Sequence, residues 1–421
     1  MQILNFSRLF VPPALAATAL IAPFHGAQAT AKFSVVYAFC QQSQTNCADG
    51  STPEGGLLAD QSGNLYGTTY YGGANDYGTV FEVAADRAET VLYSFCPEAQ
   101  DKEPCNDGAL PSASLIESGG NLYGTTASGG EKNRGTVFEI SSGGTETVLY
   151  SFCSQEHCSD GARPLAGLVM DSEGNLYGTT YEGGNANCPK GCGTVFELAS
   201  GGAESVLYPF CSETKCADGA HPTAPLELSS GSLYGTTEQG GAANRGTVFE
   251  ISSGNAETVL YSFCGRKSCA DGAEPTAGIV MDTSGDLYGT TSRGGNPNCP
   301  AGCGTVFELA ASGSESVLYA FCPKGTCPDG AEPGTGELLI AGNGNTLYGT
   351  TDAGGKDGFG TAFMLSGGTE TVLHSFNNED GEPSAGLIAV NGDLYGTTFG
   401  SFYQNEFGVV FKLGTADGRS R

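Results

Sequence analysis

Apolar and polar positions alternate in short blocks along most of this chain. Blocks such as VLYSF, LYGTT and GTVFE are rich in Val, Leu, Tyr, Phe and Thr, and Gly, Asn, Asp or Ser bound them. In the VLYSF block, Val91, Tyr93 and Phe95 share one face of an extended segment. Residues after position 30 form no apolar stripe with the helical period of about 3.6 residues. The pattern therefore predicts an all-β protein built from short strands.

These blocks recur in a fixed order seven times. One unit contains four of them, which we term strands a (for example GLVMD), b (LYGTT), c (GTVFE) and d (VLYSF). A unit spans about 55 residues, because the tyrosine of strand b stands at Tyr66, Tyr123, Tyr177, Tyr234, Tyr288, Tyr348 and Tyr395. Four short strands per unit predict a seven-bladed β-propeller. A β-solenoid is the alternative, although solenoid coils are usually shorter.

The order of the strands predicts how the ring closes. The chain after position 30 starts with a lone d strand at residues 33–39, and its last strand is a c strand at 408–413. We therefore expect the N-terminal strand to complete the C-terminal blade, which leaves no unpaired closing edge. The expected domain is a single propeller over residues 30–413, followed by a short polar tail at 414–421.

The first 29 residues have the features of a secretion signal. Arg8 supplies a short positive region, residues 9–21 are mostly apolar, and residues 27–29 match the small-x-small cleavage pattern. Pro12 and Pro13 interrupt the apolar run, which is also too short for a membrane-spanning helix. We expect residues 1–29 to be removed and the mature protein to be secreted or periplasmic, without membrane insertion.

The net charge of the chain limits the kinds of molecule that we expect it to bind. The chain has 46 acidic and 18 basic residues, a formal net charge of −28. A surface this negative repels nucleic acid and anionic lipid, so neither is an expected partner. It favours solubility and is compatible with divalent cations or basic partners.

The chain contains 16 cysteines, and all of them fall into local pairs. Six pairs stand between strand d and the next strand a: Cys40 with Cys47, Cys96 with Cys105, Cys153 with Cys158, Cys211 with Cys216, Cys264 with Cys269, and Cys322 with Cys327. Two stand between strands b and c: Cys188 with Cys192, and Cys299 with Cys303. The spacings are not the usual C-x₂-C of a zinc site, and a catalytic thiol needs an unpaired cysteine. Behind a secretion signal, the pattern predicts eight disulfides and no metal site.

The two b–c pairs belong to nearly identical stretches. Residues 183–197 read GGNANCPKGCGTVFE and residues 294–308 read GGNPNCPAGCGTVFE. The two stretches lie 111 residues apart, which indicates duplication of a two-blade unit. Because strands alternate in direction, the d–a and b–c loops emerge on one face of the ring. We term this surface the loop face and expect function to reside there.

Each d–a loop contains an Asp-Gly turn, and these turns are the first candidate site. The aspartates are Asp49, Asp107, Asp160, Asp218, Asp271, Asp329 and Asp380. A ring of carboxylates near a channel could bind Ca²⁺ or a polar ligand. Alternatively, each Asp accepts hydrogen bonds from backbone N–H groups of its own turn. Because a residue repeated in every blade usually serves the blade, the second interpretation is favoured.

The second candidate site is the loop 399–408, FGSFYQNEFG, which breaks the repeat in the seventh unit. Its aromatic residues, Phe399, Phe402, Tyr403 and Phe407, could stack on a sugar or pack over the junction of the chain ends. The second interpretation is favoured. The chain has no His-x-x-x-His pair, no G-x-S-x-G motif and no phosphate loop, so no catalytic residues and no cofactor are predicted.

The repeat unit GNLYGTTxxGGxxxxGTVFE…ETVLYSF…DGAxPxAGL resembles the Gloeo/Verruco repeat of bacterial "choice-of-anchor tandem repeat GloVer-containing" proteins. The resemblance covers nearly all of the chain after the signal. It implies a bacterial protein that is secreted or displayed at the surface. It implies no established activity and no catalytic residues.

Two functions remain open from the sequence. The first is an exported, non-enzymatic propeller that binds an extracellular glycan, peptide or protein on its loop face. The second is a carbohydrate-active or lactone-cleaving enzyme, since propellers host many activities. A uniform ring of repeated residues favours binding, whereas an acidic pair confined to one or two blades would favour the enzyme.

Overall fold

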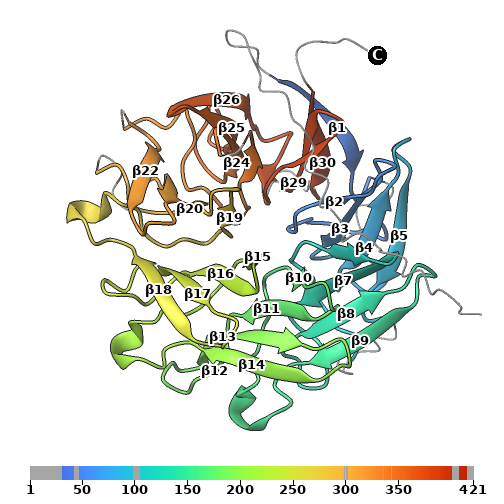
Figure 1. Cartoon of the computed structure of the whole chain (residues 1–421). Coiled ribbons are helices and arrows are strands. Elements are labelled where there is room, and N and C mark those ends of the chain that lie inside the picture. Colours follow the sequence, from blue (N-terminus) through green and yellow to red (C-terminus); the bar gives the residue numbers. More distant parts are fainter. Residues whose placement is uncertain are drawn as a thin grey trace, which may run out of the picture.

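The computed structural model describes residues 31–41, 47–97, 105–297, 299, 302–323, 325–334, 336–342, 344–400 and 407–414. Seven antiparallel sheets, each built on four strands, stand around a common axis (Figure 1). The protein is therefore a seven-bladed β-propeller, which confirms the predicted fold and excludes the solenoid. The predicted signal, residues 1–29, lies outside the described residues.

The blades are numbered in the order of their LYGTT blocks, and their strands run from the axis outward in the order a, b, c, d (Figure 1). Blade 1 contains β2 (Leu58–Ala59), β3 (Leu65–Thr69), β4 (Thr79–Val83) and β5 (Glu89–Ser94). Blade 2 contains β6 (Ile116–Ser118), β7 (Asn121–Thr126), β8 (Thr136–Ile140) and β9 (Glu146–Ser151). Blade 3 contains β10 (Val169–Met170), β11 (Leu176–Thr180), β13 (Gly191–Leu198) and β14 (Glu204–Pro209), with the short β12 (Gly183–Gly184) beside β13.

The next three blades repeat this arrangement. Blade 4 contains β15 (Glu227–Ser229), β16 (Ser232–Thr237), β17 (Thr247–Ile251) and β18 (Glu257–Ser262). Blade 5 contains β19 (Val280–Met281), β20 (Leu287–Thr291), β21 (Thr305–Leu309) and β22 (Glu315–Ala320). Blade 6 contains β23 (Leu339–Ala341), β24 (Thr346–Thr351), β25 (Thr361–Ser366) and β26 (Thr369–Ser375).

Blade 7 joins the two ends of the chain. It contains β28 (Ile388–Val390), β29 (Asp393–Phe399), β30 (Val409–Gly414) and the N-terminal β1 (Lys32–Ala38), with the short β27 (Glu382–Pro383) beside β29. Strand β1 pairs antiparallel with β30 from Lys32↔Gly414 to Ala38↔Val409. This pairing confirms the predicted closure, in which the first strand completes the last blade.

The repeated LYGTT and GTVFE blocks encode contacts that hold each blade and its neighbour. A Cβ atom on Gly67 would lie 2.7 Å from the Phe81 ring, so only glycine fits there. The hydroxyl of Thr68 donates to the carbonyl of Ala113 in the next blade at 3.0 Å. The same link to the next blade recurs from Thr125, Thr179, Thr236, Thr350 and Thr397, the last of which closes the ring from blade 7 to blade 1.

Phenylalanine pairs fill the seams between blades. The buried Phe directly after each d strand meets the Phe of the next blade's c strand edge-to-face, a favourable geometry for aromatic rings. These seven pairs are Phe39–Phe81, Phe95–Phe138, Phe152–Phe196, Phe210–Phe249, Phe263–Phe307, Phe321–Phe363 and Phe376–Phe411. The same Phe–Phe contact therefore joins every pair of neighbouring blades around the ring.

Helical structure within the described residues is limited to three 3₁₀ turns. These turns are η1 (Glu156–Cys158), η2 (Thr214–Cys216) and η3 (Lys267–Cys269), and each lies inside a d–a loop. No helix in this part of the chain combines the length and the apolar character that crossing a bilayer requires.

Candidate functional site: the axial channel and its mouth

The sixteen cysteines form eight disulfides, and the partners are those predicted from the sequence. The bonds join Cys40 and Cys47, Cys96 and Cys105, Cys153 and Cys158, Cys188 and Cys192, Cys211 and Cys216, Cys264 and Cys269, Cys299 and Cys303, and Cys322 and Cys327. Each bond closes a segment within one loop, and no free cysteine remains.

Besides the disulfides, hydrogen bonds and apolar packing hold the loops of the loop face in place. The longest closed segment is that between Cys96 and Cys105, with a sequence separation of 9 residues. Both of these cysteines are buried and pack with Ala109 in one small apolar cluster. The d–a and b–c loops are also hydrogen-bonded to each other: Gly73 N, for example, donates to Cys47 O at 2.8 Å. The described parts of the loop face are therefore cross-linked by disulfides and by hydrogen bonds between loops.

In the structure, the seven predicted aspartates make hydrogen bonds within their own loops and to the preceding d strands. Asp49 Oδ2 accepts hydrogen bonds from the Tyr37 hydroxyl and from Cys40 N, each at 2.8 Å. Asp107, Asp160, Asp218, Asp271 and Asp329 repeat the bond from the d-strand tyrosine, and His374 replaces this tyrosine beside Asp380. Because these tyrosines stand on the outermost strands, the seven carboxylates do not converge on the axis.

Two of the four predicted aromatic residues of the loop 399–408 are described, and they lie in different places. Phe399 lies at the end of β29 and lines a cavity at the axis. Phe407 packs against the core cluster that joins blade 7 to blade 1 and contains Phe39 and Val410. Phe402 and Tyr403 lie outside the described residues.

Two connected cavities follow the axis of the ring. The mouth has a volume of about 770 Å³ and is lined by residues of the d–a and b–c loops. The inner channel has a volume of about 410 Å³ and is lined by the segments that lead into the a strands. Glu54, Ser112, Leu165 and Thr223 line both, so the two form one continuous funnel.

Three carboxyl groups from adjacent blades line the mouth. Glu54 precedes strand a of blade 1, Asp352 follows strand b of blade 6, and Glu382 lies in β27 of blade 7. Burial raises the pKa of Glu54 to about 7. Burial, followed by the nearby Glu382 and Glu332 carboxylates, raises the pKa of Asp352 to about 7. Burial also raises the pKa of Glu382.

Asp352 owes its position to a missing side chain. Gly334 directly follows the proline of its repeat, at the position where other blades carry a residue such as Glu54 or Leu165. A Cβ atom on Gly334 would collide with the Asp352 carboxylate. The glycine therefore creates the space in which Asp352 lies.

Two further carboxyl groups stand deeper, in the inner channel. Glu227 begins β15, at the position where other a strands carry Ile116, Val169 or Ile388. Glu337 is an extra residue in the segment before β23. Burial raises the pKa of both to about 7, and the Glu227 carboxylate adds to the rise at Glu337. The two acids therefore lie near each other in the inner channel.

In the described part of the chain, the carboxyl groups of the funnel have no cationic ion-pair partner. Arg163 lines the mouth, but its guanidinium donates to Glu182 Oε1 at 3.1 Å and is thereby engaged. Among the described residues, no lysine, arginine or histidine forms an ion pair with any of the five funnel acids, which are Glu54, Asp352, Glu382, Glu227 and Glu337. The funnel is thus an acidic, partly desolvated cavity whose negative charge grows as pH rises through about 7.

Aromatic side chains complete the mouth beside these acids. The rings of Tyr70 and Tyr71 meet edge-to-face with centroids 4.7 Å apart, and Phe399 lines the same cavity. Burial, followed by the nearby Glu54 carboxylate, raises the pKa of the Tyr70 hydroxyl. Blades 6, 7 and 1 therefore supply both the acids and the aromatics of the mouth.

Reasoning from the sequence did not single out these acids. It concentrated on residues shared by all blades, whereas the funnel residues differ from blade to blade. The position after LYGTT carries Tyr70, Ala127, Tyr181, Glu238, Ser292, Asp352 and Phe399 in turn. Departures from the repeat at positions near the axis were the signal that would have identified the site.

The ring of blades around a funnel defines the chain as a β-propeller protein. Four overlapping matches to the Gloeobacter/Verrucomicrobia repeat cover residues 24–217, 101–300, 186–333 and 267–421. The chain therefore belongs to the Gloeobacter/Verrucomicrobia repeat family, in agreement with the resemblance seen in its sequence. No curated protein matches it.

Several solved structures align with this chain at low identity and with TM-scores below 0.5. A puromycin-hydrolyzing peptidase of Mycobacterium tuberculosis aligns with a TM-score of 0.46 at 13% identity, over 83% of this chain and 49% of the peptidase. A luciferin-regenerating enzyme aligns with a TM-score of 0.43 at 12% identity, over 88% of this chain and 95% of the enzyme. A protein designated a gluconolactonase aligns with a TM-score of 0.40 at 14% identity, over 82% of this chain and 95% of that protein. Similarity at this level carries no activity over to this chain.

Proposed function

We propose that this protein is an exported binding protein whose funnel takes a positively charged group of a peptide or protein. One observation carries the proposal: five carboxyls without a described ion-pair partner line one continuous cavity. A ligand ammonium or guanidinium would neutralise these acids in a partly desolvated site, where charge pairs are stronger than in water. The eight disulfides support an oxidising location outside the cytoplasm.

The walls of the mouth suit the apolar part of such a ligand. Tyr70, Tyr71 and Phe399 offer aromatic surface to a lysine or arginine stem, and a cation over a ring gains further stabilisation. The disulfides and the hydrogen bonds between described loops limit the conformational entropy that these loops lose on binding. A mouth of about 770 Å³ has room for one or two side chains of a peptide.

The test is fluorescence anisotropy with a labelled tetralysine peptide and the same peptide with acetylated lysines. We expect only the cationic peptide to bind, with an affinity that falls as salt rises. Its affinity should increase from pH 6 to pH 8, because Glu54 and Asp352 lose their protons in this range.

Variants decide whether the funnel is the site. Glu54→Gln and Asp352→Asn should each weaken binding more than tenfold, as loss of one partner of a buried charge pair does. Glu173→Gln is the matched control, because Glu173 is exposed in an a–b turn on the opposite face. Equal effects of all three changes, or binding of neutral glycans in place of the cationic peptide, would contradict the proposal.

A second candidate function is hydrolysis of a glycosidic or lactone bond. The observation that favours it is the confinement of Glu54, Asp352 and Glu382 to three adjacent blades, with pKa values of about 7 at the first two. A carboxyl group with this pKa can donate or accept a proton at neutral pH. Chromogenic glycosides and lactones test this function, and turnover that Asp352→Asn abolishes would establish it over simple binding.

A further inference from the structure

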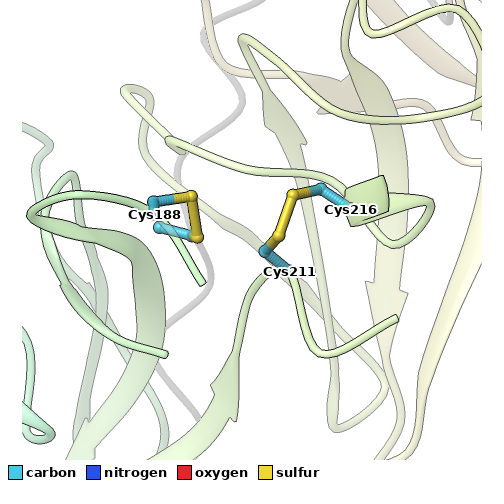
Figure 2. A group of neighbouring side chains, drawn as sticks. Cys188, Cys211 and Cys216 are labelled. Atoms are coloured by element: carbon cyan, nitrogen blue, oxygen red, sulfur yellow. A yellow bond between two sulfur atoms is a disulfide. The ribbon is translucent and has the colours of Figure 1, made fainter. Parts of the chain in front are cut away.

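Two pairs of disulfides meet on the loop face, one in blade 3 and one in blade 5. In blade 3, the b–c loop disulfide Cys188–Cys192 lies beside the d–a loop disulfide Cys211–Cys216 (Figure 2). The four sulfur atoms all lie within 4.8 Å of one another. The tertiary structure thus unites cysteines that the sequence presents as two separate local pairs.

The cluster in blade 5 has the same composition. It contains Cys299, Cys303, Cys322 and Cys327, whose sulfur atoms also lie within 4.8 Å of one another. Two sulfur atoms from different disulfides, those of Cys303 and Cys327, are 3.8 Å apart. The two-blade duplication has therefore copied a four-sulfur cluster, since blades 3 and 5 are the blades that carry cysteines in the b–c loop.

The 3.8 Å between the sulfur atoms of Cys303 and Cys327, which belong to different disulfides, matches the spacing in a tetrahedral metal–thiolate site, and the bonded sulfurs reach this spacing only after reduction. A zinc–sulfur bond of about 2.3 Å places the sulfur atoms of a tetrahedral site about 3.8 Å apart. The remaining disulfides, such as Cys153–Cys158, are not part of any group of three or more potential ligands within the described residues. In that part of the chain, only the two clusters offer a complete set of four ligands.

The backbone around each cluster is held by bonds that do not depend on the disulfides. In blade 3, the Cys192 carbonyl accepts from the His221 backbone N–H at 2.8 Å, and the Cys211 carbonyl accepts from the Asn187 side chain at 2.8 Å. In blade 5, the Cys303 carbonyl accepts from the Glu332 backbone N–H at 2.9 Å. Cys192 and Cys322 are also fully buried in the disulfide-bonded protein.

We propose that each cluster is a redox-gated site for one soft divalent metal ion, of which Zn²⁺ is the natural example. In the oxidised protein the sulfurs are tied in disulfides and do not act as thiolate ligands. Two dithiol reductant molecules supply four electrons and four protons, break both S–S bonds and become two cyclic disulfides. One Zn²⁺ then forms four Zn–S bonds and releases the four thiol protons.

The test uses Co²⁺ as a spectroscopic probe of the full-length mature protein, reduced and handled without oxygen. We expect visible absorption of tetrahedral cobalt thiolate that saturates at about two metal ions per chain and disappears when Zn²⁺ is added. The oxidised protein should show no such absorption. Absence of a saturable signal in the reduced protein would overturn the proposal.

Matched double variants locate the metal. Cys188→Ser with Cys192→Ser should lower the cobalt stoichiometry to about one per chain, and Cys299→Ser with Cys303→Ser should do the same. The control, Cys96→Ser with Cys105→Ser, removes as many thiols from a disulfide outside both clusters and should leave about two sites. Equal losses in all three variants would show non-specific thiol binding.

A parallel measurement shows whether the chain unfolds when its disulfides are reduced. If circular dichroism shows that the reduced chain unfolds, the proposal predicts that Zn²⁺ restores the β signal in the parent and in the control variant. Restoration should be weaker in either cluster variant, because metal binding to a preformed site supplies folding free energy. A reduced chain that Zn²⁺ does not refold would count against the sites.

Discussion

The hydroxyl of Tyr37 lies 2.8 Å from Asp49 Oδ2 and 3.4 Å from Glu89 Oε2, where blade 7 meets blade 1. A phenol donates one hydrogen, so it cannot satisfy both carboxylates at once. Burial, followed by the Asp49 charge, raises the pKa of Glu89 to about 7. Equivalent glutamates at other seams, Glu146, Glu204, Glu257 and Glu370, have pKa values raised to about 7 by burial and by a neighbouring aspartate.

The first prediction is that the propeller is more stable at pH 5 than at pH 8. The folded protein holds protons on these glutamates up to about pH 7, whereas an unfolded chain releases them near pH 4.3. The stabilisation is therefore complete below the unfolded pKa and is lost as pH rises through the folded value. Thermal melts at constant ionic strength should show a fall of several degrees, and a higher melting temperature at pH 8 would refute it.

The second prediction isolates one seam. Glu257→Gln removes a carboxyl whose pKa is raised to about 7 by burial and then by the Asp218 and Glu213 charges. The neutral amide should raise the melting temperature at pH 8 and leave it nearly unchanged at pH 5. Glu173→Gln, in an exposed turn, is the control and should have no pH-dependent effect. The same shift at both pH values would mean that the seam charge is not responsible.

The third prediction concerns ring closure. Deletion of residues 30–40 removes β1 and exposes the edge of β30, so we expect aggregation or a large loss of stability. Val35→Thr is the mild control, because this side chain is 40% exposed on the same strand. Size-exclusion chromatography and thermal melts measure both. A deletion variant that stays monomeric and as stable as the parent would disprove closure through β1.

The fourth prediction tests why LYGTT requires its glycine. Gly67→Ala places a methyl group 2.7 Å from the Phe81 ring, inside a packed blade. Overpacking of this kind costs about 1–3 kcal/mol in the free energy of unfolding, measured by chemical denaturation. Gly143→Ala is the control, because its Cβ would meet only Ser141 Oγ at 3.8 Å. Equal stability of the two variants would contradict the packing argument.

The fifth prediction concerns the aspartates of the d–a loops. Asp218 is fully buried and accepts bonds from the Tyr208 hydroxyl and from Ser212 N, each at 2.8 Å. Asp218→Ala should therefore cost about 1–3 kcal/mol, because these two donors and Glu213 N, at 3.3 Å, lose their acceptor. Ca²⁺ should raise the melting temperature no more than sodium at matched ionic strength. A Ca²⁺-specific rise that is lost in Asp218→Asn with Asp271→Asn would instead make these residues a cation site.

The sequence by itself determined the repeating part of this protein. The number of blades, the order of strands, the closure by residues 33–39 and the partners of each disulfide all follow from it. The blades and the disulfides depend on contacts within one repeat or between one repeat and the next, and the closure follows from the strand order, which leaves a lone d strand at the start and a c strand at the end. Cys153 and Cys158, for example, are 5 residues apart and share one loop, so their spacing alone predicts the bond.

Only the tertiary structure decided which residues meet at the axis and across loops. Glu54 and Asp352 line the same mouth although almost the whole ring separates them in the chain, and Cys188 meets Cys216 from another loop. A propeller brings one position from every blade to its centre, whatever residue stands there. The repeat therefore specifies the scaffold, whereas the neighbours of each funnel acid depend on where the closed ring places residues from distant blades, for which no local pattern exists.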